Sequence, residues 1–421
     1  MVRAIVGANW GDEGKGKITD MLASESDIVV RFQGGANAGH TIINDYGRFA
    51  LHLLPSGVCT PGVVNVLGPG VALDIEFFLK ELAAIEQQGL PAPKILISER
   101  AQVLMPYHVA LDCYEEERLG KNSFGSTKSG IAPFYGDKFQ KIGLQLCQLY
   151  YPDVLREKLA HALDIKNAMI VNLYHREPVD LEALIVKLTE LAERIRPYVA
   201  DTDAYMMQAV REGKKILLEG QLGTLRDPDH GIYPMVTSSS PLAGYGPVGA
   251  GVPVWSIKEV IAVTKAYSSC VGEGPFTCEW FGADAEKLRE AGAEYGAKTG
   301  RPRRVGPIDL VATRYGVEVQ GATNIALTKL DILSYMDEIP VCAAYELDGE
   351  ITHEFPFPAV LERAKPVMEY LPGWGCDISG VRTWADMPQA ARDYVEYVEQ
   401  AIGCHIGYVS VGAERESLII R

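Results

Sequence analysis

The chain has 421 residues and a formal net charge of −15 at pH 7, with 47% hydrophobic and 23% charged residues. This is the composition of an ordinary globular protein, and its acidity argues against nucleic acid as a main partner. No apolar run approaches the ~20 residues that span a bilayer, so we expect no membrane contact. The eight cysteines form no Cys-x-x-Cys pair, which excludes that kind of zinc or redox motif and favours reduced thiols in a cytoplasmic protein.

The first predicted element is a short apolar strand at 4–6, which a glycine-rich loop joins to a helical pattern beginning near Ile18. A strand, a glycine loop and a helix in this order present backbone N–H groups to phosphate. Residues 11–17 have the spacing of a P-loop, but Ile18 stands where a P-loop has the Ser or Thr that holds Mg²⁺. The loop instead carries Asp12 and Glu13. A carboxylate in an anion-binding loop is electrostatically costly unless a metal or a proton transfer uses it.

A second strand pattern, at 27–32, ends in another glycine loop at 34–41, which repeats the P-loop spacing with His40 in place of the lysine. A histidine beside a phosphoryl group can protonate a leaving oxygen or stabilise its charge. The alternative is a tight connection between strands, which would leave Asn37 and His40 without a role. We favour a phosphate site built from both loops.

The next segment alternates strands with one clear helix. Apolar strand patterns lie at 49–54, 63–67 and 94–98. Residues 75–88 form an amphipathic pattern, and Asp74 before it can cap a helix that Gly89 can end.

Helical patterns dominate from about 100 to 212, notably at 181–195 and 200–212. We interpret this region as a helical insertion. It encloses a polar, glycine-containing loop at 125–130 that we expect to be exposed and mobile.

The strand pattern returns at 215–220, and a long irregular tract follows at 220–253. Such a tract is too long for a passive connection, so we expect it to bind a ligand. Further strands are predicted at 323–331, 338–346 and 405–411, with helices between them. The whole chain, 1–421, therefore indicates one α/β domain with a large, mainly parallel central sheet, flanking helices and a P-loop-like GTP-binding architecture.

Two further motifs indicate binding sites. Residues 328–331 read Thr-Lys-Leu-Asp after an apolar strand. GTP-binding proteins use Asn-Lys-x-Asp at such a place, where the Asp accepts two hydrogen bonds from guanine and the Lys stem packs on the base. Residues 300–304 hold three arginines, which can bind carboxylates or phosphates bidentately. The alternatives are a surface Lys-x-Asp and a solvated basic turn; the hydroxyl cluster at 237–240 is equally compatible with a plain loop.

Residues 9–17 and 34–41 together closely resemble the adenylosuccinate synthetase family, whose members join IMP and L-aspartate with GTP in the first committed step of AMP synthesis from IMP. The resemblance covers the whole chain. It continues through residues 51–57, 229–231, 233–234, 236–239, 265–268, 299–304 and 328–331.

The resemblance implies a two-step reaction. Asp12 would act as general base on N1 of IMP while O6 attacks the γ-phosphate of GTP, and His40 would act as acid toward the β,γ-bridge. Lys15 and Lys17 would offset the charge of the transferring phosphate, and Asp12 with the backbone oxygen of Gly39 would hold Mg²⁺. The amino group of aspartate would then displace the phosphate of 6-phosphoryl-IMP.

The resemblance also implies three sets of ligand-binding residues and a homodimer with a shared active site. Those for GTP are Gly11, Glu13, Gly14, Lys15, Gly16, Lys17, Gly39, His40, Thr41, Arg303, Lys329, Asp331, Ser410 and Gly412. Those for IMP are Asp12, Asn37, Thr127, Lys141, Gln221, Leu222, Thr237 and Arg301. Those for aspartate are Thr299, Arg301 and Arg303.

The chain departs from the family pattern at several of these places. Lys141 stands where the family has an arginine that crosses to the second subunit, Gln221 is displaced by one position so that Leu222 takes its place, and Pro302 interrupts the arginine run. Cys270 also replaces an arginine. Two alternatives therefore stay open: a paralogue with the same chemistry on another purine nucleotide or amine, and a GTP-binding protein without ligase activity.

Overall fold

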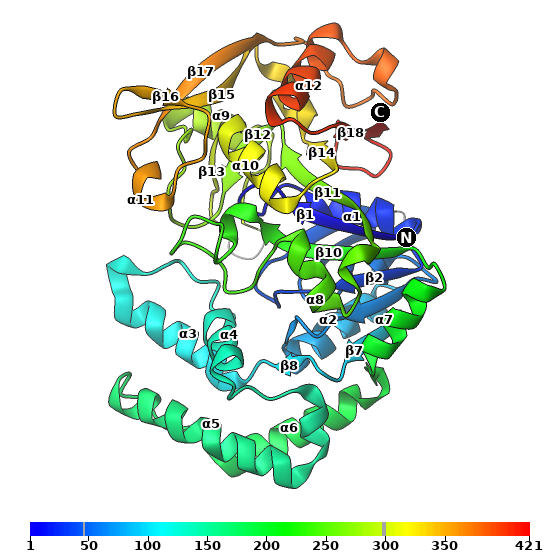
Figure 1. Cartoon of the computed structure of the whole chain (residues 1–421), viewed down its shortest axis with the longest axis vertical. Coiled ribbons are helices and arrows are strands. Elements are labelled where there is room, and N and C mark those ends of the chain that lie inside the picture. Colours follow the sequence, from blue (N-terminus) through cyan, green and yellow to red (C-terminus); the bar gives the residue numbers. More distant parts are fainter. Residues whose placement is uncertain (45–46, 297–299) are drawn as a thin grey trace.

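The computed structural model describes residues 1–44, 47–296 and 300–421. Its centre is a ten-stranded sheet with the strand order β19-β18-β14-β11-β1-β10-β2-β5-β7-β9 (Figure 1). All neighbouring pairs are parallel except β18 and β19. The strands are β1 (Val2–Gly7), β2 (Ile28–Arg31), β5 (Val64–Leu67), β7 (Lys94–Ser98), β9 (Val199–Ala200), β10 (Ile216–Gly223), β11 (Ile257–Lys265), β14 (Asn324–Thr328), β18 (Ile406–Ser410) and β19 (Leu418–Ile420). The predicted large, mainly parallel sheet is confirmed.

The predicted helices agree closely with the structure where their ends carry a chemical signal. Helix α1 (Lys15–Ser24) follows the first glycine loop, and α2 (Ile75–Gln87) begins after Asp74, whose carboxylate accepts the N–H of Phe77 at 2.9 Å. Helices α6 (Leu181–Ile195) and α7 (Thr202–Arg211) match the patterns at 181–195 and 200–212.

The second glycine loop differs from the first because no helix follows it. It leads into β3 (His40–Asn44), which pairs antiparallel with β4 (Gly47–Leu51). The strand expected at 49–54 is the second arm of this hairpin. The β-branched residues Thr41 and Ile42 favour a strand after the loop.

The helical insertion is found over residues 100–195, at one end of the molecule beyond the β7–β9 edge of the sheet (Figure 1). Helix α7, which the expected range of 100–212 included, contributes Met206 and Ala209 to the main core instead. The helices of the insertion are α3 (Pro106–Leu119), α4 (Ile131–Gln140), α5 (Pro152–Asn172) and α6. A buried ionic cluster joins three of them: Asp137 of α4 accepts a hydrogen bond from His108 of α3 at 2.9 Å and pairs with Lys166 of α5. We call residues 100–195 the helical subregion.

A second sheet, which the sequence patterns did not predict, lies at the opposite end (Figure 1). It contains β12 (Tyr267–Cys270), β13 (Arg304–Asp309), β15 (Glu338–Leu347), β16 (Glu350–Thr352) and β17 (Lys365–Pro372). The strand predicted at 338–346 is therefore found, but in this sheet. The remaining elements are β6 (Ala72–Leu73), β8 (Gln102–Val103), α8 (Gly246–Ala250), α9 (Gly282–Ala291), α10 (Leu310–Gln320), α11 (Pro358–Leu361) and α12 (Gln389–Ile402).

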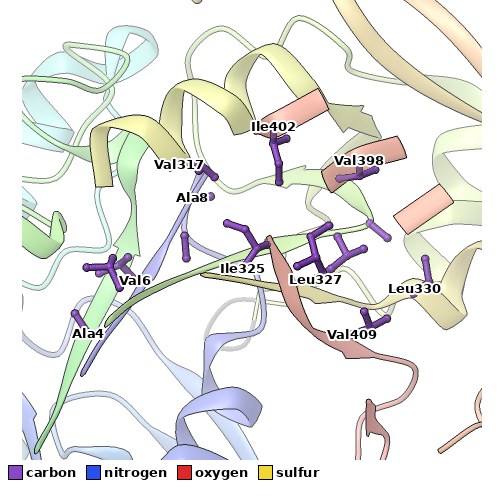
Figure 2. Close-up of a cluster of buried hydrophobic side chains, with 14 of the residues drawn as sticks. Ala4, Val6, Ala8, Val317, Ile325, Leu327, Leu330, Val398, Ile402 and Val409 are labelled. Carbon is purple, nitrogen blue, oxygen red and sulfur yellow. The ribbon is translucent and has the colours of Figure 1, made fainter. Parts of the chain in front are cut away.

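The main core lies between the central sheet and helices α10 and α12. Figure 2 shows side chains of β1, β14 and β18 meeting those of the two helices; the labelled residues are Ala4, Val6, Ala8, Val317, Ile325, Leu327, Leu330, Val398, Ile402 and Val409. This packing fixes the strands whose carboxyl ends carry the predicted site. Among the described residues, no helix is both long and apolar enough to cross a membrane.

Candidate functional site

The first glycine loop lies at the carboxyl end of β1 and is braced from within by Glu13. The side chain of Glu13 is only 3% exposed, and its Oε1 accepts the backbone N–H groups of Asn9 at 3.0 Å and Gly11 at 2.7 Å. Gly14 has a φ of 84° just before α1, a left-handed conformation that favours glycine. The carboxylate of Glu13 is thus committed to shaping the loop, which leaves Asp12 as the acidic side chain that faces outward.

The two lysines of this loop have different partners. Lys15 Nζ lies 2.7 Å from Glu13 Oε2 and 2.9 Å from the carbonyl of Gly11, so it stays beside the loop. Lys17 Nζ reaches the turn between β18 and β19, where it donates to Ser410 Oγ and to the carbonyl of Gly412, both at 2.8 Å. Burial lowers the pKa of Lys17 to about 8.

The two glycine loops meet at Gly16. A Cβ at Gly16 would lie 2.8 Å from the carbonyl oxygen of Thr41 and 3.2 Å from the ring of His40. Only glycine permits this approach, because Cβ atoms essentially never lie so close to a backbone oxygen. The two loops that the sequence predicts to act together are therefore in contact, although the second loop leads into a hairpin.

His40 is held by groups that sequence reasoning did not select. Its Nε2 lies 2.9 Å from Ser56 Oγ and 3.4 Å from Glu219 Oε1, and its side chain is 17% exposed. Burial lowers the pKa of His40 to about 4 even though Glu219 opposes the shift. The imidazole is consequently neutral at pH 7 in the protein without nucleotide.

Glu219 is itself buried and fully engaged. It accepts the N–H of Ser56 at 2.8 Å and pairs with Arg31 at 3.0 Å. Arg31, the last residue of β2, is the register partner of Glu219 in the middle of β10. Opposite charges at the ends of two predicted buried strands were a usable sequence signal for this pair.

Gln221 and Leu222, two of the expected IMP contacts, occupy an irregularity of β10 between the partners of Ile5 and Gly7. Gln221 is 4% exposed, and its Nε2 donates to the carbonyls of Gly35 at 2.8 Å and Ala38 at 3.1 Å. Gln221 therefore stabilises the second glycine loop through these two hydrogen bonds. Leu222 has a φ of 64°, and its backbone lies directly against Gly11.

The loop between β14 and the following short helix carries the guanine-type motif. Asp331 Oδ1 is buried and has no hydrogen-bond partner among the described residues, and burial raises the pKa of Asp331. Lys329 has a φ of 59°, and its Nζ donates to the carbonyl of Gly292 at 2.6 Å and to Glu294 at 2.7 Å.

The three arginines at 301–304 have distinct positions. Arg303 Nη1 lies 2.7 Å from Glu294 Oε2, and its Nε lies 3.3 Å from Asp12 Oδ2. Arg304 instead holds a neighbouring loop by donating to the carbonyl of Gly274 at 2.7 Å. Arg301 is 63% exposed and lies 3.3 Å from Glu273 Oε1. Thr299, the remaining expected aspartate contact, lies outside the described residues.

A family model described as adenylosuccinate synthetase matches residues 4–419. The chain belongs to the adenylosuccinate synthetase family. The family enzyme of Bifidobacterium animalis subsp. lactis is 45% identical over 416 residues, which cover 99% of this chain and 97% of that protein. The enzyme of Mycobacterium tuberculosis is 46% identical over 419 residues, with the same two coverages of 99% and 97%.

Solved structures agree with this assignment. The fully ligated adenylosuccinate synthetase from Plasmodium falciparum has a TM-score of 0.93 at 34% identity, covering 100% of this chain and 99% of that one. A cyanophage S-2L succinoaminodeoxyadenylate synthetase bound to dGMP and dATP has a TM-score of 0.61 at 19% identity, with coverages of 100% and 95%, and shows the shared fold alone. As a member of the adenylosuccinate synthetase family, the chain is a nucleotide-binding ligase of purine biosynthesis that forms a C–N bond between IMP and aspartate. This argues against a GTP-binding protein without ligase activity.

Some residues that the adenylosuccinate synthetase resemblance places at IMP lie on the outer parts of the fold. Thr127 is exposed on the loop before α4, and Lys141 is exposed at the end of α4 with a φ of 67°. Among the described residues, neither side chain bonds to the loops around Asp12 and His40. Thr237 donates its backbone N–H to the carbonyl of Arg226 at 2.9 Å, and Asn37 Oδ1 accepts the N–H of Gly35 at 3.1 Å.

Cys270, which stands where the family has an arginine, has the arginine of another segment beside it. Cys270 is buried, and Arg226 Nη2 lies 3.1 Å from its Sγ. A guanidinium from a different segment thus lies beside the position where the adenylosuccinate synthetase family has an arginine.

Proposed function

We propose that the chain uses GTP and Mg²⁺ to ligate IMP and L-aspartate through a 6-phosphoryl-IMP intermediate. The observation that carries this proposal is the place of Asp12. Its carboxylate is 28% exposed, projects from a phosphate-type loop, and lies 3.3 Å from Arg303. Arg303 belongs to residues 300–304, which we call the arginine loop. A base in contact with both a phosphate cradle and an anion-binding arginine suits a reaction that joins phosphoryl transfer to attack by an amino acid.

The residues around Asp12 support defined roles in the first step. Asp12 would take the proton from N1 of IMP as O6 attacks the γ-phosphate, while Lys15 offsets the charge of the transferring group. His40 is neutral in the free protein, and the negative charge of bound phosphate would favour its protonated form. Ser56 and Glu219 hold the imidazole in place for that change.

The residues also fit a magnesium ion. Among the described residues no three His, Cys, Asp or Glu side chains form a metal cluster, and Mg²⁺ is commonly bound by one carboxylate together with substrate phosphates. Asp12 and the exposed backbone of Gly39 would supply the protein ligands. The bound ion would neutralise charge on the phosphates.

Guanine specificity is supported by Asp331. A buried carboxylate oxygen without a partner is unfavourable by itself, and the N1–H and 2-amino groups of guanine would satisfy it. Lys329 precedes Asp331 by two residues in the same motif, and Ser410 and Gly412 lie where Lys17 donates its hydrogen bonds. The base would therefore sit between the carboxyl ends of β14 and β18.

A homodimer is supported by the surface of the helical subregion. Large apolar side chains are exposed there, including Phe139 at 74%. Further examples are Tyr151, Ile165, Met169 and Leu173. Such exposure is typical of a surface that a partner covers. Lys141, two residues after Phe139, would then reach the IMP phosphate of the second subunit as a point charge instead of a bidentate arginine.

The test of this function is turnover of purified protein with IMP, GTP, Mg²⁺ and aspartate, followed by the absorbance change of adenylosuccinate formation. We expect Asp12→Ala and His40→Ala each to abolish phosphoryl transfer while circular dichroism shows an intact fold. Folded protein without turnover, or equal turnover with ATP, would contradict the proposal.

The alternative is a ligase for another purine nucleotide or amine, which the altered environment of Gln221 and Leu222 keeps open. A competition assay with IMP, GMP and dGMP separates the two. Preference for a nucleotide other than IMP would establish the alternative.

A further inference from the structure

One buried carboxylate, Glu294, receives four hydrogen bonds from side chains of three segments, at 265–267, 303 and 329. Its side chain is 0% exposed. Its Oε1 accepts from Lys265 Nζ at 2.8 Å, Lys329 Nζ at 2.7 Å and the Tyr267 hydroxyl at 2.5 Å, and its Oε2 accepts from Arg303 Nη1 at 2.7 Å. No motif in the sequence marks this residue, and none of the roles assigned above uses it.

On one side, Glu294 forms the base of the arginine loop. The backbone N–H of Arg303 donates to the carbonyl of Glu294 at 2.9 Å, so Arg303 is tied to it by both backbone and side chain. Next to this pair, Tyr295 and Pro302 form an isolated β-bridge. The position of the exposed Arg301 therefore depends on the pair formed by Glu294 and Arg303.

On the other side, Glu294 fixes the lysine of the guanine motif. The ammonium of Lys329 lies between Glu294 and the carbonyl of Gly292. Lys329 precedes Asp331 by two positions in the sequence. The same carboxylate thus contacts a group that would read the base and a group that would hold the amino acid. Arg303 extends the chain of contacts to Asp12, 3.3 Å away.

The charge of Glu294 is permanent in this setting. Burial by itself would raise the pKa of Glu294, but Lys265, Lys329 and Arg303 together hold the pKa well below its usual range. Burial lowers the pKa of Lys265 to about 8, with Glu294 opposing the shift. Without the carboxylate, three cations would face one another in a buried space, and their mutual repulsion would displace the two that can move, Lys329 and Arg303.

We propose that Glu294 is a positioning residue that couples binding of the guanine nucleotide to binding of the amino acid. A base seated against Lys329 holds that lysine on Glu294, which in turn holds Arg303, and through it Arg301, in the position that accepts the carboxylates of aspartate. This inference rests on the proposed function for the identity of the two ligands. Coupling between two sites must be reciprocal: each ligand strengthens the other by the same factor.

The experiment measures this factor by titration calorimetry on the full-length protein at saturating IMP. The affinity for L-aspartate is determined with and without GDP, and the affinity for GDP with and without aspartate. We expect the unchanged protein to show a factor on the order of 10 in both directions. In Glu294→Gln the factor should fall to within about twofold of 1, whereas Glu294→Asp, which keeps the charge but cannot reach all four partners, should restore part of it.

The matched control is Asp137→Asn, the same carboxylate-to-amide change in the buried cluster of the helical subregion. It should lower thermal stability and leave the coupling factor unchanged. Independent binding of GDP and aspartate to the unchanged protein, or full coupling in folded Glu294→Gln, overturns the inference while leaving the proposed function in place. Failure of the unchanged protein to bind GDP overturns the proposed function and the inference with it.

Discussion

His40 shows how one buried side chain makes stability depend on pH. Its pKa is lowered from 6.5 to about 4, chiefly by burial. Between these two values the unfolded chain binds a proton that the folded chain does not. The folded state therefore has its full stability above pH 6.5 and loses part of it as the pH falls toward 4.

We expect His40→Asn to remove this part of the acid sensitivity. Through this group alone, the free energy of unfolding of the wild-type protein should be about 2 kcal/mol lower at pH 5 than at pH 7. The variant should not show this decrease. Urea unfolding at pH 7 and pH 5 measures the difference. His161→Asn, at an exposed position of α5, serves as control; equal acid sensitivity of all three proteins would rule out this role of His40.

At the scale of residues, the sequence marks the groups that we propose to touch substrate better than the groups that hold them in place. Asp12, His40 and the Lys329–Asp331 pair stand in motifs whose chemistry is local. Glu219 and Glu294 contact side chains from other segments of the chain, so their roles can be recognised only in the folded protein. Their burial against arginine and lysine is a property of tertiary structure, to which no spacing rule applies.

At the scale of elements, the contact between α1 and β3 depends on the absence of a side chain at Gly16. Gly16→Ala should favour the helix by about 1 kcal/mol from propensity alone. Its methyl group would, however, lie 2.8 Å from the carbonyl of Thr41, so the hairpin must move away from the first loop. We expect kcat/KM to fall on the order of 100-fold, since misplacement of reacting groups by about 1 Å has that effect.

Gly136 of α4 offers the matched control for this substitution. Nothing lies within 4 Å of a Cβ at Gly136, so Gly136→Ala should gain about 0.5–1 kcal/mol of stability and retain its activity. Steady-state kinetics and urea unfolding of both variants give the comparison. Unchanged kinetics in Gly16→Ala would show that the two loops need not touch.

Helices and strands could be predicted from the sequence where polar and apolar residues alternate with a regular period, or where a capping residue marks the end of a helix. Helix α2 has both signals, an apolar stripe and the Asp74 cap. Strand β17 has neither, because its residues are exposed or half-buried along its whole length and no alternation marks its faces. The hairpin of β3 and β4 was hidden by a glycine spacing that also occurs in P-loops.

At the scale of the whole molecule, the apolar surface of the helical subregion predicts a dimer that activity requires. Phe139→Asp should place a charge in this surface and give a monomer with weakened IMP binding, because Lys141 would no longer reach the second subunit. Sedimentation velocity over a range of protein concentrations measures the assembly. Phe281→Asp is the control, since Phe281 is 79% exposed next to α9, at the other end of the molecule. A wild-type protein that stays monomeric would contradict the dimer.

The position of β1 in the middle of the sheet has a consequence for synthesis of the chain. Its two neighbours are β10 and β11, so after β1 has left the ribosome it cannot be paired on both sides until residue 265 has followed. At the usual pace of translation this takes on the order of 10–50 s. During that interval the apolar segment 2–7 is open to chaperones and to strands of other nascent chains. The loop that carries Asp12 can therefore take its final form only late in biosynthesis.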